Sequence, residues 1–409
     1  MSLLIDSRRA AHEAPRGSAR HGLGFWLIAA VFLTALAFST VPAPLYPLYQ
    51  RQDGFSAFTV TIVFAVYAVG VITALVLAGH ISDWTGRKRI LLPALAIEIV
   101  AAVLFLTWTA LPGLILARFL TGVGVGLITA TATAYLLELH SAHRPHAGRG
   151  RFEIISSAAN LGGLGVGTLV SGALAQFVTA PLRTPYVVFL ILLALGVVAV
   201  ATVPETVIAP AVRPHYRPQR PRIGAGDRVA YLVAAAGAFA AFAVYGLFTS
   251  LAPGFVAGAL HHPSRLLAGV VAFLVFGAGV TSQAVTGALD PRRRFGLGLI
   301  AQATGVLVLA AGMQLPSLGL FLAGGIIAGA GSGLLFKTAV GTVAAAAQPA
   351  VRGEALAGLF LIGYAGLILP VLGIGIATQF VTVTTAMLGF TVLLLVLIAG
   401  IVVLRRRNR

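Results

Sequence analysis

The sequence contains no cysteine and few charged residues. Of its 409 residues none is Cys and only 10% are Asp, Glu, Lys or Arg. The lack of cysteine excludes disulfide bonds and thiol chemistry. The chain also has no GxxxxGK[ST] phosphate loop and no HExxH pattern, and its nine histidines have no ligand spacing. We therefore expect no enzyme activity and no metal site.

Long apolar runs dominate the chain instead. Hydrophobic residues make up 58% of it, against roughly 45–50% in soluble domains. A run of about 20 apolar residues crosses a hydrocarbon core of about 30 Å, and twelve such runs are present. Lipid cannot satisfy backbone polar groups, so each run is predicted to be a helix of an all-α membrane protein. The predicted spans are 25–45, 57–79, 90–111, 114–137, 154–178, 185–203, 229–251, 266–289, 296–315, 318–344, 355–379 and 383–404.

Positive charge is concentrated on one side of this arrangement. Twenty-three of the 28 Lys and Arg residues fall in the segments of one side, and three fall in loops of the other. The positive-inside rule places the rich side and both termini in the cytoplasm, and the protein in the cytoplasmic (inner or plasma) membrane. The first span lacks a clean cleavage site and is predicted to stay uncleaved. Basic residues scattered over seven segments form no groove for nucleic acid.

The twelve spans divide six and six. The segment 204–228 contains "APAVRPHYRPQRPRIGAGDR", whose Pro and Arg residues favour an extended, solvated linker. Asp83 before "GRKR" is repeated as Asp290 before "PRRR" at an offset of 207, which indicates two pseudo-symmetric bundles with a substrate site between them. Chance similarity among Gly- and Ala-rich helices is the alternative. The predicted parts are an N-terminal tail 1–24, a bundle 25–203, the linker 204–228, a bundle 229–404 and a C-terminal tail 405–409.

The loop "GHISDWTGRKR" at 79–89 has an ordered set of polar residues. It resembles the loop pattern GxLaDrxGrkxxl of the major facilitator superfamily, which is matched by Gly79, Asp83, Gly86, Arg87 and Lys88. The resemblance implies two six-helix bundles that work by alternating access, and a loop that holds the inner side closed when the carrier opens outward. An ordinary positive-inside turn explains the cations but not the Gly–Asp–Gly spacing.

Helix four contains "LILARFLTGVGVG", which resembles the embedded Arg and spaced glycines of the same superfamily. Arg118 lies about 11 Å outward of the helix midpoint by helical rise. It either faces inward, with Gly122 and Gly126 allowing close helix packing, or extends to the outer interface.

Helix five contains "GGLGVGTLVSG", which resembles the GxxxGPxxGG motif of proton-coupled drug antiporters. Thr168 replaces the Pro and Ser171 replaces a Gly, which weakens the antiporter assignment. Gly163, Gly167 and Gly172 keep the capacity for close packing.

Several loop charges also match features of the superfamily. Glu138, Arg149, Asp290 and the "PET" at 204–206 are interpreted as partners in a charge network at the inner gate, with solvated loop charges as the alternative.

Lys337 is one of two lysines in the chain and lies about 7 Å inward of the middle of its apolar run. A charge at that depth needs water, a partner or a ligand. If the resemblance holds, helix ten lines a central cavity, and Lys337 with Arg118 binds an anionic group or Lys337 exchanges a proton. The alternative is a lysine that extends to the cytoplasmic interface.

Three further residues complete the candidate site. Glu98, about 4 Å inward of the centre of helix three, is the one acid within a predicted span, and is either a proton-coupling group or a structural carboxyl. Helix one contains "STVPAPLYPLYQ", whose prolines predict a break toward its outer end. Tyr46 there and Tyr245 either line the substrate path or belong to an interfacial belt.

These features predict a secondary active transporter that exports a small organic molecule, amphipathic or anionic, by proton antiport. The alternatives are an organic-acid uptake symporter or uniporter and, from another class, a non-transporting receptor or lipid-moving protein. We expect a monomer whose partners are its substrate and membrane lipids, with a proton gradient as energy source and no cofactor.

Overall fold

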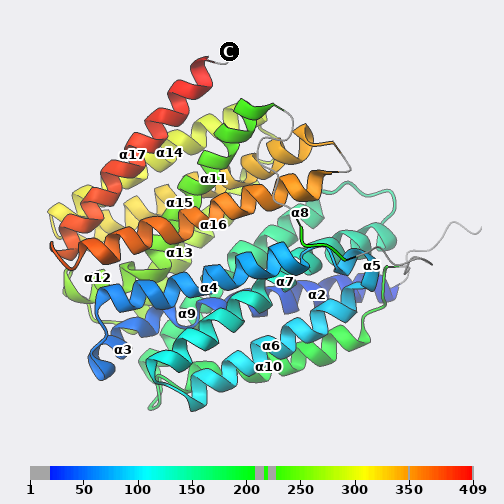
Figure 1. The fold of residues 1–409 in the computed structure, drawn as a ribbon, viewed down its shortest axis with the longest axis horizontal. Coiled ribbons are helices and arrows are strands. Elements are labelled where there is room, and N and C mark those ends of the chain that lie inside the picture. Colours follow the sequence, from blue (N-terminus) through cyan, green and yellow to red (C-terminus); the bar gives the residue numbers. More distant parts are fainter. Residues whose placement is uncertain (1–18, 208–215, 220–226, 349–350, 408–409) are drawn as a thin grey trace, which may run out of the picture.

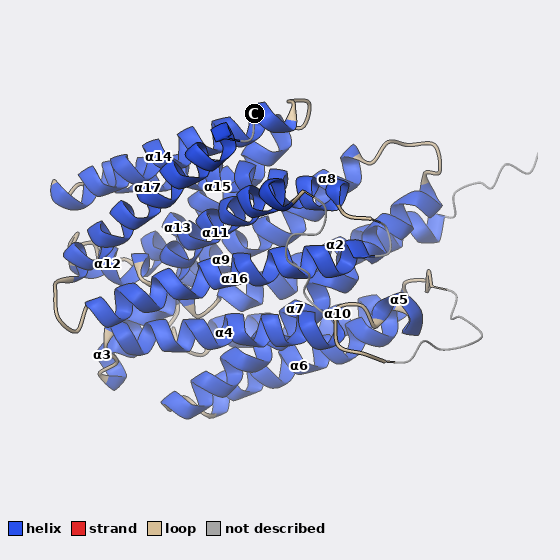
Figure 2. Cartoon of the chain, turned by 45° about the horizontal axis from the view of Figure 1, so that its top comes forward, coloured by secondary structure: helices blue, strands red, loops and turns tan. Residues whose placement is uncertain are grey.

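The structure, a computed structural model, describes residues 19–207, 216–219, 227–348 and 351–407. Over these residues it has twelve helical spans long and apolar enough to cross a membrane (Figure 1), and it contains no strand (Figure 2). The predicted all-α fold with twelve spans is therefore confirmed. Much of the predicted linker and tails lies outside the described residues.

The spans form two groups in the order of the chain. The first six occupy the lower part of Figure 1 and the last six the upper part. The first group comprises α2 (Ala19–Thr40), η1 (Ala43–Leu45), α3 (Tyr46–Asp53), α4 (Ala57–Ala78), α5 (Ser82–Thr85), α6 (Arg87–Thr107), α7 (Leu111–His143), α8 (Gly150–Ser157), η2 (Ala158–Gly162), α9 (Gly163–Phe177) and α10 (Thr184–Thr202). The second comprises α11 (Arg228–Ser250), α12 (Ala252–Gly258), α13 (Arg265–Val285), α14 (Pro291–Gln314), α15 (Leu318–Ala346), α16 (Arg352–Ala377) and α17 (Val383–Arg407).

Side-chain caps explain where many helices begin. Ser56, Ser264 and Ser317 accept backbone N–H bonds at the starts of α4, α13 and α15. Asp227 and Asp290 do the same for α11 and α14. Each cap satisfies N–H groups that have no partner within the helix, and a carboxylate also complements the positive end of the helix dipole.

Two spans are not continuous α-helices. In the first, α2 ends at Thr40, and η1 and α3 follow. Pro42 lies just before η1 and Pro44 lies within it, as expected where prolines remove backbone donors. In the fifth, the π-helical turn η2 interrupts the span, which hydropathy could not predict. The fourth span also continues to His143, six residues beyond its predicted end, because its last turns are polar but still helical.

We call the end of the bundle that carries the loops 79–86, 144–149 and 286–290 the basic end, and the other the far end. The basic end lies on the right in Figure 1, where α5 and α8 are labelled.

The two halves touch along α4 with α16 and along α9 with α13. At the second contact, a Cβ on Gly172 would lie 3.1 Å from the Cα of Gly269, so glycine is needed for this approach.

Candidate functional site

A cavity of about 440 Å³ lies between the two halves. Its walls come from α2, η1, α3, α4, α7, α8, η2 and α9 of the first half and from α11, α13, α15 and α16 of the second. Among the described residues that line it, Arg118 is the one cation and there is no Asp or Glu. Nine aromatic residues form much of the wall: Tyr46, Phe64, Tyr67, Phe242, Tyr245, Phe276, Phe336, Phe360 and Tyr364.

The halves are bonded to each other at the far end. Thr168 Oγ1 shares its one hydrogen between Gly165 O of its own helix at 2.7 Å and Gly269 O of the other half at 3.1 Å. Arg265 donates through its backbone N–H to Gln176 Oε1 at 3.0 Å, and through Nη1 to Ala175 O at 2.7 Å. The three bonds between the halves join the fifth span to the eighth and hold the far end closed.

Toward the basic end, the cavity reaches almost to the ends of its helices. Leu75 and Leu356 line it, and they lie about one helical turn from the end of α4 and the start of α16. The cavity therefore extends from a closed far end toward the basic end.

Arg118 is buried inside the protein instead of extending to the interface. The residue is 2% exposed, and Nη1 donates to Ser39 O on α2 at 2.6 Å. The guanidinium also lies over the ring of Tyr67, 4.5 Å from the centroid. A cation–π contact and a hydrogen bond to a carbonyl stabilise the charge without neutralising it. The cavity wall is consequently positive at this point.

Three buried polar atoms of the cavity lining have no hydrogen-bond partner among the described residues. They are Tyr46 Oη, Thr129 Oγ1 and Arg118 Nε. Buried polar groups in proteins are rarely left unpaired. Tyr245, by contrast, donates to Gly329 O at 3.3 Å and stacks on Phe276 with ring centroids 4.8 Å apart. Both predicted tyrosines thus line the cavity, but Tyr46 is the one with an unused hydroxyl.

Lys337 lies beside the cavity wall and not in it. Its Nζ donates to Gln283 O at 3.0 Å and is 3.9 Å from Glu153 Oε2 on α8. Gln283 lines the cavity, and its Oε1 accepts from Ser157 at 2.9 Å. Sequence analysis missed Glu153, Ser157 and Gln283. These contacts join the fifth span to the eighth and tenth, so Lys337 belongs to a polar contact between the halves.

Glu98 is fully buried and outside the cavity lining. Its exposure is 0%, and neither carboxyl oxygen has a hydrogen-bond partner among the described residues. A Cβ on Gly124 of α7 would come within 2.8 Å of the Glu98 Cγ, so this glycine provides the room for the side chain. Glu98 is therefore enclosed between α6 and α7 and does not meet the substrate path directly.

The other glycines of the predicted packing motifs lie at helix contacts. A Cβ on Gly122 or Gly126 would collide with the backbone of α4. One on Gly163 or Gly167 would collide with that of α2, and one on Gly172 with that of α13 across the halves. The first four therefore bring helices together within one half, and Gly172 brings the two halves together.

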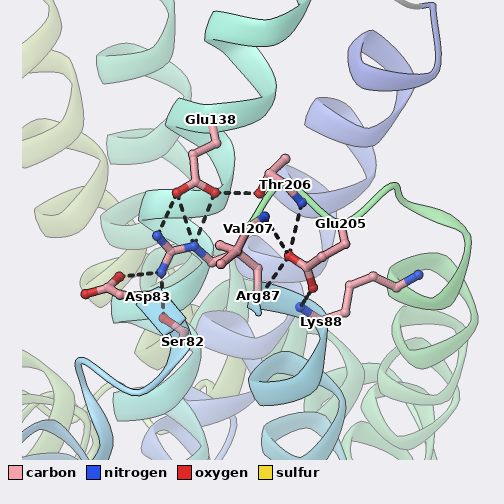
Figure 3. A network of polar contacts seen from close by, with 8 residues as sticks. All are labelled: Ser82, Asp83, Arg87, Lys88, Glu138, Glu205, Thr206 and Val207. Carbon is pink, nitrogen blue, oxygen red and sulfur yellow. Dashed lines mark hydrogen bonds and ion pairs between the residues drawn. The ribbon is translucent and has the colours of Figure 1, made fainter. Parts of the chain in front are cut away.

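At the basic end, Arg87 is the centre of a polar network, shown in Figure 3. Nη1 donates to Asp83 at 2.6 Å and to Ser82 at 2.7 Å, and Nη2 donates to Glu138 at 2.6 Å. The Arg87 side chain is 7% exposed, whereas that of Asp83 is 62% exposed. Thr206 donates to the second oxygen of Glu138 at 2.5 Å. Arg87 thus ties the loop to α7 and to the segment after α10.

Gly86 has the backbone conformation that this network requires. Its φ is +111°, which side chains disfavour, and a Cβ would lie 2.8 Å from Glu205 Oε2. The Glu205 carboxylate accepts the backbone N–H of Arg87 at 2.9 Å and that of Lys88 at 3.0 Å. It therefore caps the start of α6, a role that the "PET" sequence alone did not reveal. The Lys88 ammonium donates to Ala201 O at 2.7 Å.

The remaining predicted gate residues lie apart from this network. Gly79 is the C-cap residue of α4. A Cβ on Gly79 would lie 3.3 Å from Gln219 Oε1 of the described linker segment. Arg149 is exposed at the start of α8, and Asp290 caps α14. Beside Asp290, sequence analysis missed the buried Arg294, whose guanidinium donates to three carbonyls at the end of α13.

A twelve-span bundle with a cavity between its halves and this loop network has the architecture of a membrane transporter. Residues 27–296, more than half of the chain, match the Major Facilitator Superfamily. The chain belongs to this superfamily, which confirms the resemblance seen in its motifs.

Curated relatives match short stretches. The uncharacterized MFS-type transporter Rv1250 of Mycobacterium tuberculosis is 30% identical over 149 residues, 36% of this chain and 25% of that protein. The multidrug resistance protein MdtL of Escherichia coli is 40% identical over 76 residues, 18% of this chain and 19% of that protein. The chain thus spans a quarter or less of the length of these relatives.

Solved structures match over nearly the whole chain. The nucleoside transporter NupG (D323A mutant) has a TM-score of 0.70 at 14% identity, covering 93% of this chain and 99% of that one. The human organic anion transporter MFSD10 has a TM-score of 0.64 at 16% identity, with 92% and 99% covered. A POT family transporter has a TM-score of 0.74 at 12% identity, with 94% and 96% covered. At these identities the likeness establishes the fold.

Proposed function

We propose that the protein moves a small amphipathic organic molecule across the cytoplasmic membrane by alternating access. The observation that carries this proposal is the central cavity, which lies between two six-span halves and is closed at the far end. A substrate that binds between two halves is exposed to either side when the halves rock about it.

The basic end is assigned to the cytoplasm. The excess of Lys and Arg in its loops follows the positive-inside rule. Both termini are then cytoplasmic, because the number of spans is even. With this orientation the cavity extends from the closed far end toward the cytoplasm.

The cavity favours an aromatic substrate with an anionic or hydrogen-bond-accepting group. Its aromatic walls supply stacking area. Arg118 supplies a positive charge, and Tyr46 and Thr129 have hydroxyls without a partner among the described residues. The lining residues include no acid, so an organic cation would find no counter-ion there.

We further propose that transport is proton-coupled export. The similarity to MdtL, a multidrug resistance protein, supports export. Glu98 is the proposed proton carrier, because a buried carboxyl without a partner strongly disfavours its charged form unless an opposite charge approaches. The Arg87 network is the proposed inner gate, since it holds the loop 82–88 against α7.

Transport into proteoliposomes tests the proposal. Purified protein is supplied with an aromatic carboxylate or with a primary amine of the same ring system, and the collapse of an imposed pH gradient is followed. We expect the carboxylate to dissipate the gradient and Arg118→Gln to abolish this effect, whereas Arg183→Gln, which removes a charge at the far end, keeps it.

Variants of Glu98 separate coupling from transport. Glu98→Gln should retain carboxylate exchange across the membrane without a pH gradient but lose the gradient-driven flux. Carboxylate accumulation on the side opposite to that expected for antiport would favour the uptake symporter. No flux of any substrate in wild-type protein would refute transport and leave the receptor or lipid-moving alternative.

A further inference from the structure

The central cavity has a second polar region, on the fifth and eighth spans. Ser156 of α8, Asn160 of the π-helical turn η2 and Gln283 of α13 line the cavity there. We call these three residues the neutral polar cluster. Turns of π-helix within α-helical spans are frequent at functional sites, and the function proposed above uses none of the three side chains.

The neutral polar cluster has hydrogen-bonding groups that the protein leaves free. Neither Ser156 Oγ nor the side-chain amide of Asn160 has a partner among the described residues. Gln283 Oε1 accepts from Ser157 at 2.9 Å, but Gln283 Nε2 has no partner among them either. Ser156 is 9% exposed and Gln283 is 5% exposed. Because polar groups this buried are rarely left unpaired, the cluster is suited to hold a polar group of a bound molecule.

No charged side chain belongs to this part of the cavity lining. Lys337 Nζ donates to the backbone carbonyl of Gln283 and lies 3.9 Å from Glu153 Oε2, and neither Lys337 nor Glu153 lines the cavity. These two opposite charges are paired with each other behind the wall. A second charged group of a ligand would find no counter-charge in the cluster, whereas a neutral hydroxyl or amide would find both donors and acceptors.

The cluster lies closer to the basic end than Arg118 does. Thr40 Oγ1 donates to Leu164 O at 2.7 Å, and Arg118 is bonded to the carbonyl of the residue before Thr40. Arg118 and Leu164 are therefore at about the same depth. The fifth span runs from the basic end to the far end, so Asn160 lies about 6 Å and Ser156 about 12 Å from this depth toward the basic end. The two polar regions are thus separated along the cavity.

We propose that the neutral polar cluster binds an uncharged hydroxyl or carboxamide group at the end of the substrate opposite to its anionic group. This inference rests on the function proposed above and narrows the substrate class to elongated aromatic acids with a second, neutral polar group. The anion lies beside Arg118, the ring packs against the aromatic wall, and the distal group exchanges hydrogen bonds with Asn160 and Gln283.

Binding of matched acids to the purified full-length protein tests this inference. The trans isomers of para-hydroxycinnamate and cinnamate have the same carboxylate and ring and differ only in the distal hydroxyl. By isothermal titration calorimetry we expect para-hydroxycinnamate to bind about tenfold more tightly, because cinnamate leaves the buried groups of the cluster unpaired. The ortho-hydroxy isomer, whose hydroxyl lies near the carboxylate, should bind like cinnamate.

Substitutions in the cavity locate this preference. Asn160→Ala should reduce it to less than about twofold and leave the affinity for cinnamate unchanged. Thr249→Val is the matched control, because Thr249 lines the cavity but its hydroxyl donates to Tyr245 O of its own helix at 2.7 Å. This variant should keep the full preference. If Asn160→Ala does not fold, Ser156→Ala removes one hydroxyl of the same cluster and should lower the preference about threefold.

Two kinds of failure can be told apart. Equal affinity of the wild-type protein for para-hydroxycinnamate and cinnamate, or an undiminished preference in the cluster variants, would overturn this inference and leave the aromatic-anion function standing. If the wild-type protein binds none of these acids, the aromatic-anion function fails, and this inference fails with it.

Discussion

Replacing Thr168 with valine should shift the protein toward the conformation that is open at the far end. Thr168 Oγ1 shares its hydrogen between Gly165 O of its own helix at 2.7 Å and Gly269 O across the two halves at 3.1 Å, and the residue is 0% exposed. Valine has nearly the same shape but no hydroxyl. Hydrogen bonds between membrane helices contribute about 0.6 kcal/mol on average and up to about 1.7 kcal/mol. The far-open population should therefore rise about threefold, and at most about eighteenfold.

The absence of native cysteine makes this population measurable. Ala43→Cys places a single thiol at a position that lines the cavity near the far end and is 3% exposed. A membrane-impermeant maleimide added outside right-side-out vesicles reaches this thiol when the far end opens. The initial labelling rate then reports the far-open population, and adding Thr168→Val should raise it about threefold.

Ser171 provides a matched control for this experiment. Its hydroxyl is equally buried and donates at 2.7 Å to Val41 O, which belongs to the same half. Ser171→Ala should therefore leave the labelling rate unchanged, although it removes a hydrogen bond of the same kind. The reasoning is refuted if Thr168→Val labels no faster than Ser171→Ala.

Three other predictions concern the basic end. Gly86→Ala should lower the free energy of unfolding by about 1–3 kcal/mol, because alanine is strained at positive φ and its Cβ would displace Glu205. Thermal unfolding measures this loss, and Gly148→Ala is the control because no atom lies near the added Cβ. Asp83→Asn should slow substrate exchange more than it weakens substrate binding, and a pure loss of affinity would contradict the gate role. Lys337→Ala should leave binding of an aromatic anion nearly unchanged, because Lys337 lies outside the cavity lining and contacts Gln283 and Glu153 instead; loss of anion binding in a folded variant would contradict this placement.

Several features of the site were predictable because they depend on local sequence. The loop 79–89 has Gly, Asp, Gly and Arg in the order that the family pattern requires. The positive φ of Gly86 and the ion pair between Arg87 and Asp83 both depend on residues that are at most four positions apart. The prolines after Thr40 likewise indicated the break in the first span. In each case the physical cause lies within a few residues of its effect.

Contacts between distant segments were not predictable in this way. Depth along a helix indicated that Lys337 needs a partner, but not that Glu153 would lie 3.9 Å away on another span. The same reasoning placed Glu98 within the membrane without showing that α6 and α7 enclose it away from the cavity. The rise per residue gives the depth of a side chain in the membrane. The direction in which that side chain points depends on how the helix is rotated against its neighbours.

The sequence alone determined the number of spans and their helical state. The transfer of each segment into lipid depends on its own apolar residues and on hydrogen bonds within its own backbone. Which side chains face the cavity, which half each polar group joins, and which end is closed were decided only by the tertiary structure. Those properties depend on how twelve helices rotate and tilt to pack against one another, and no single segment contains that information.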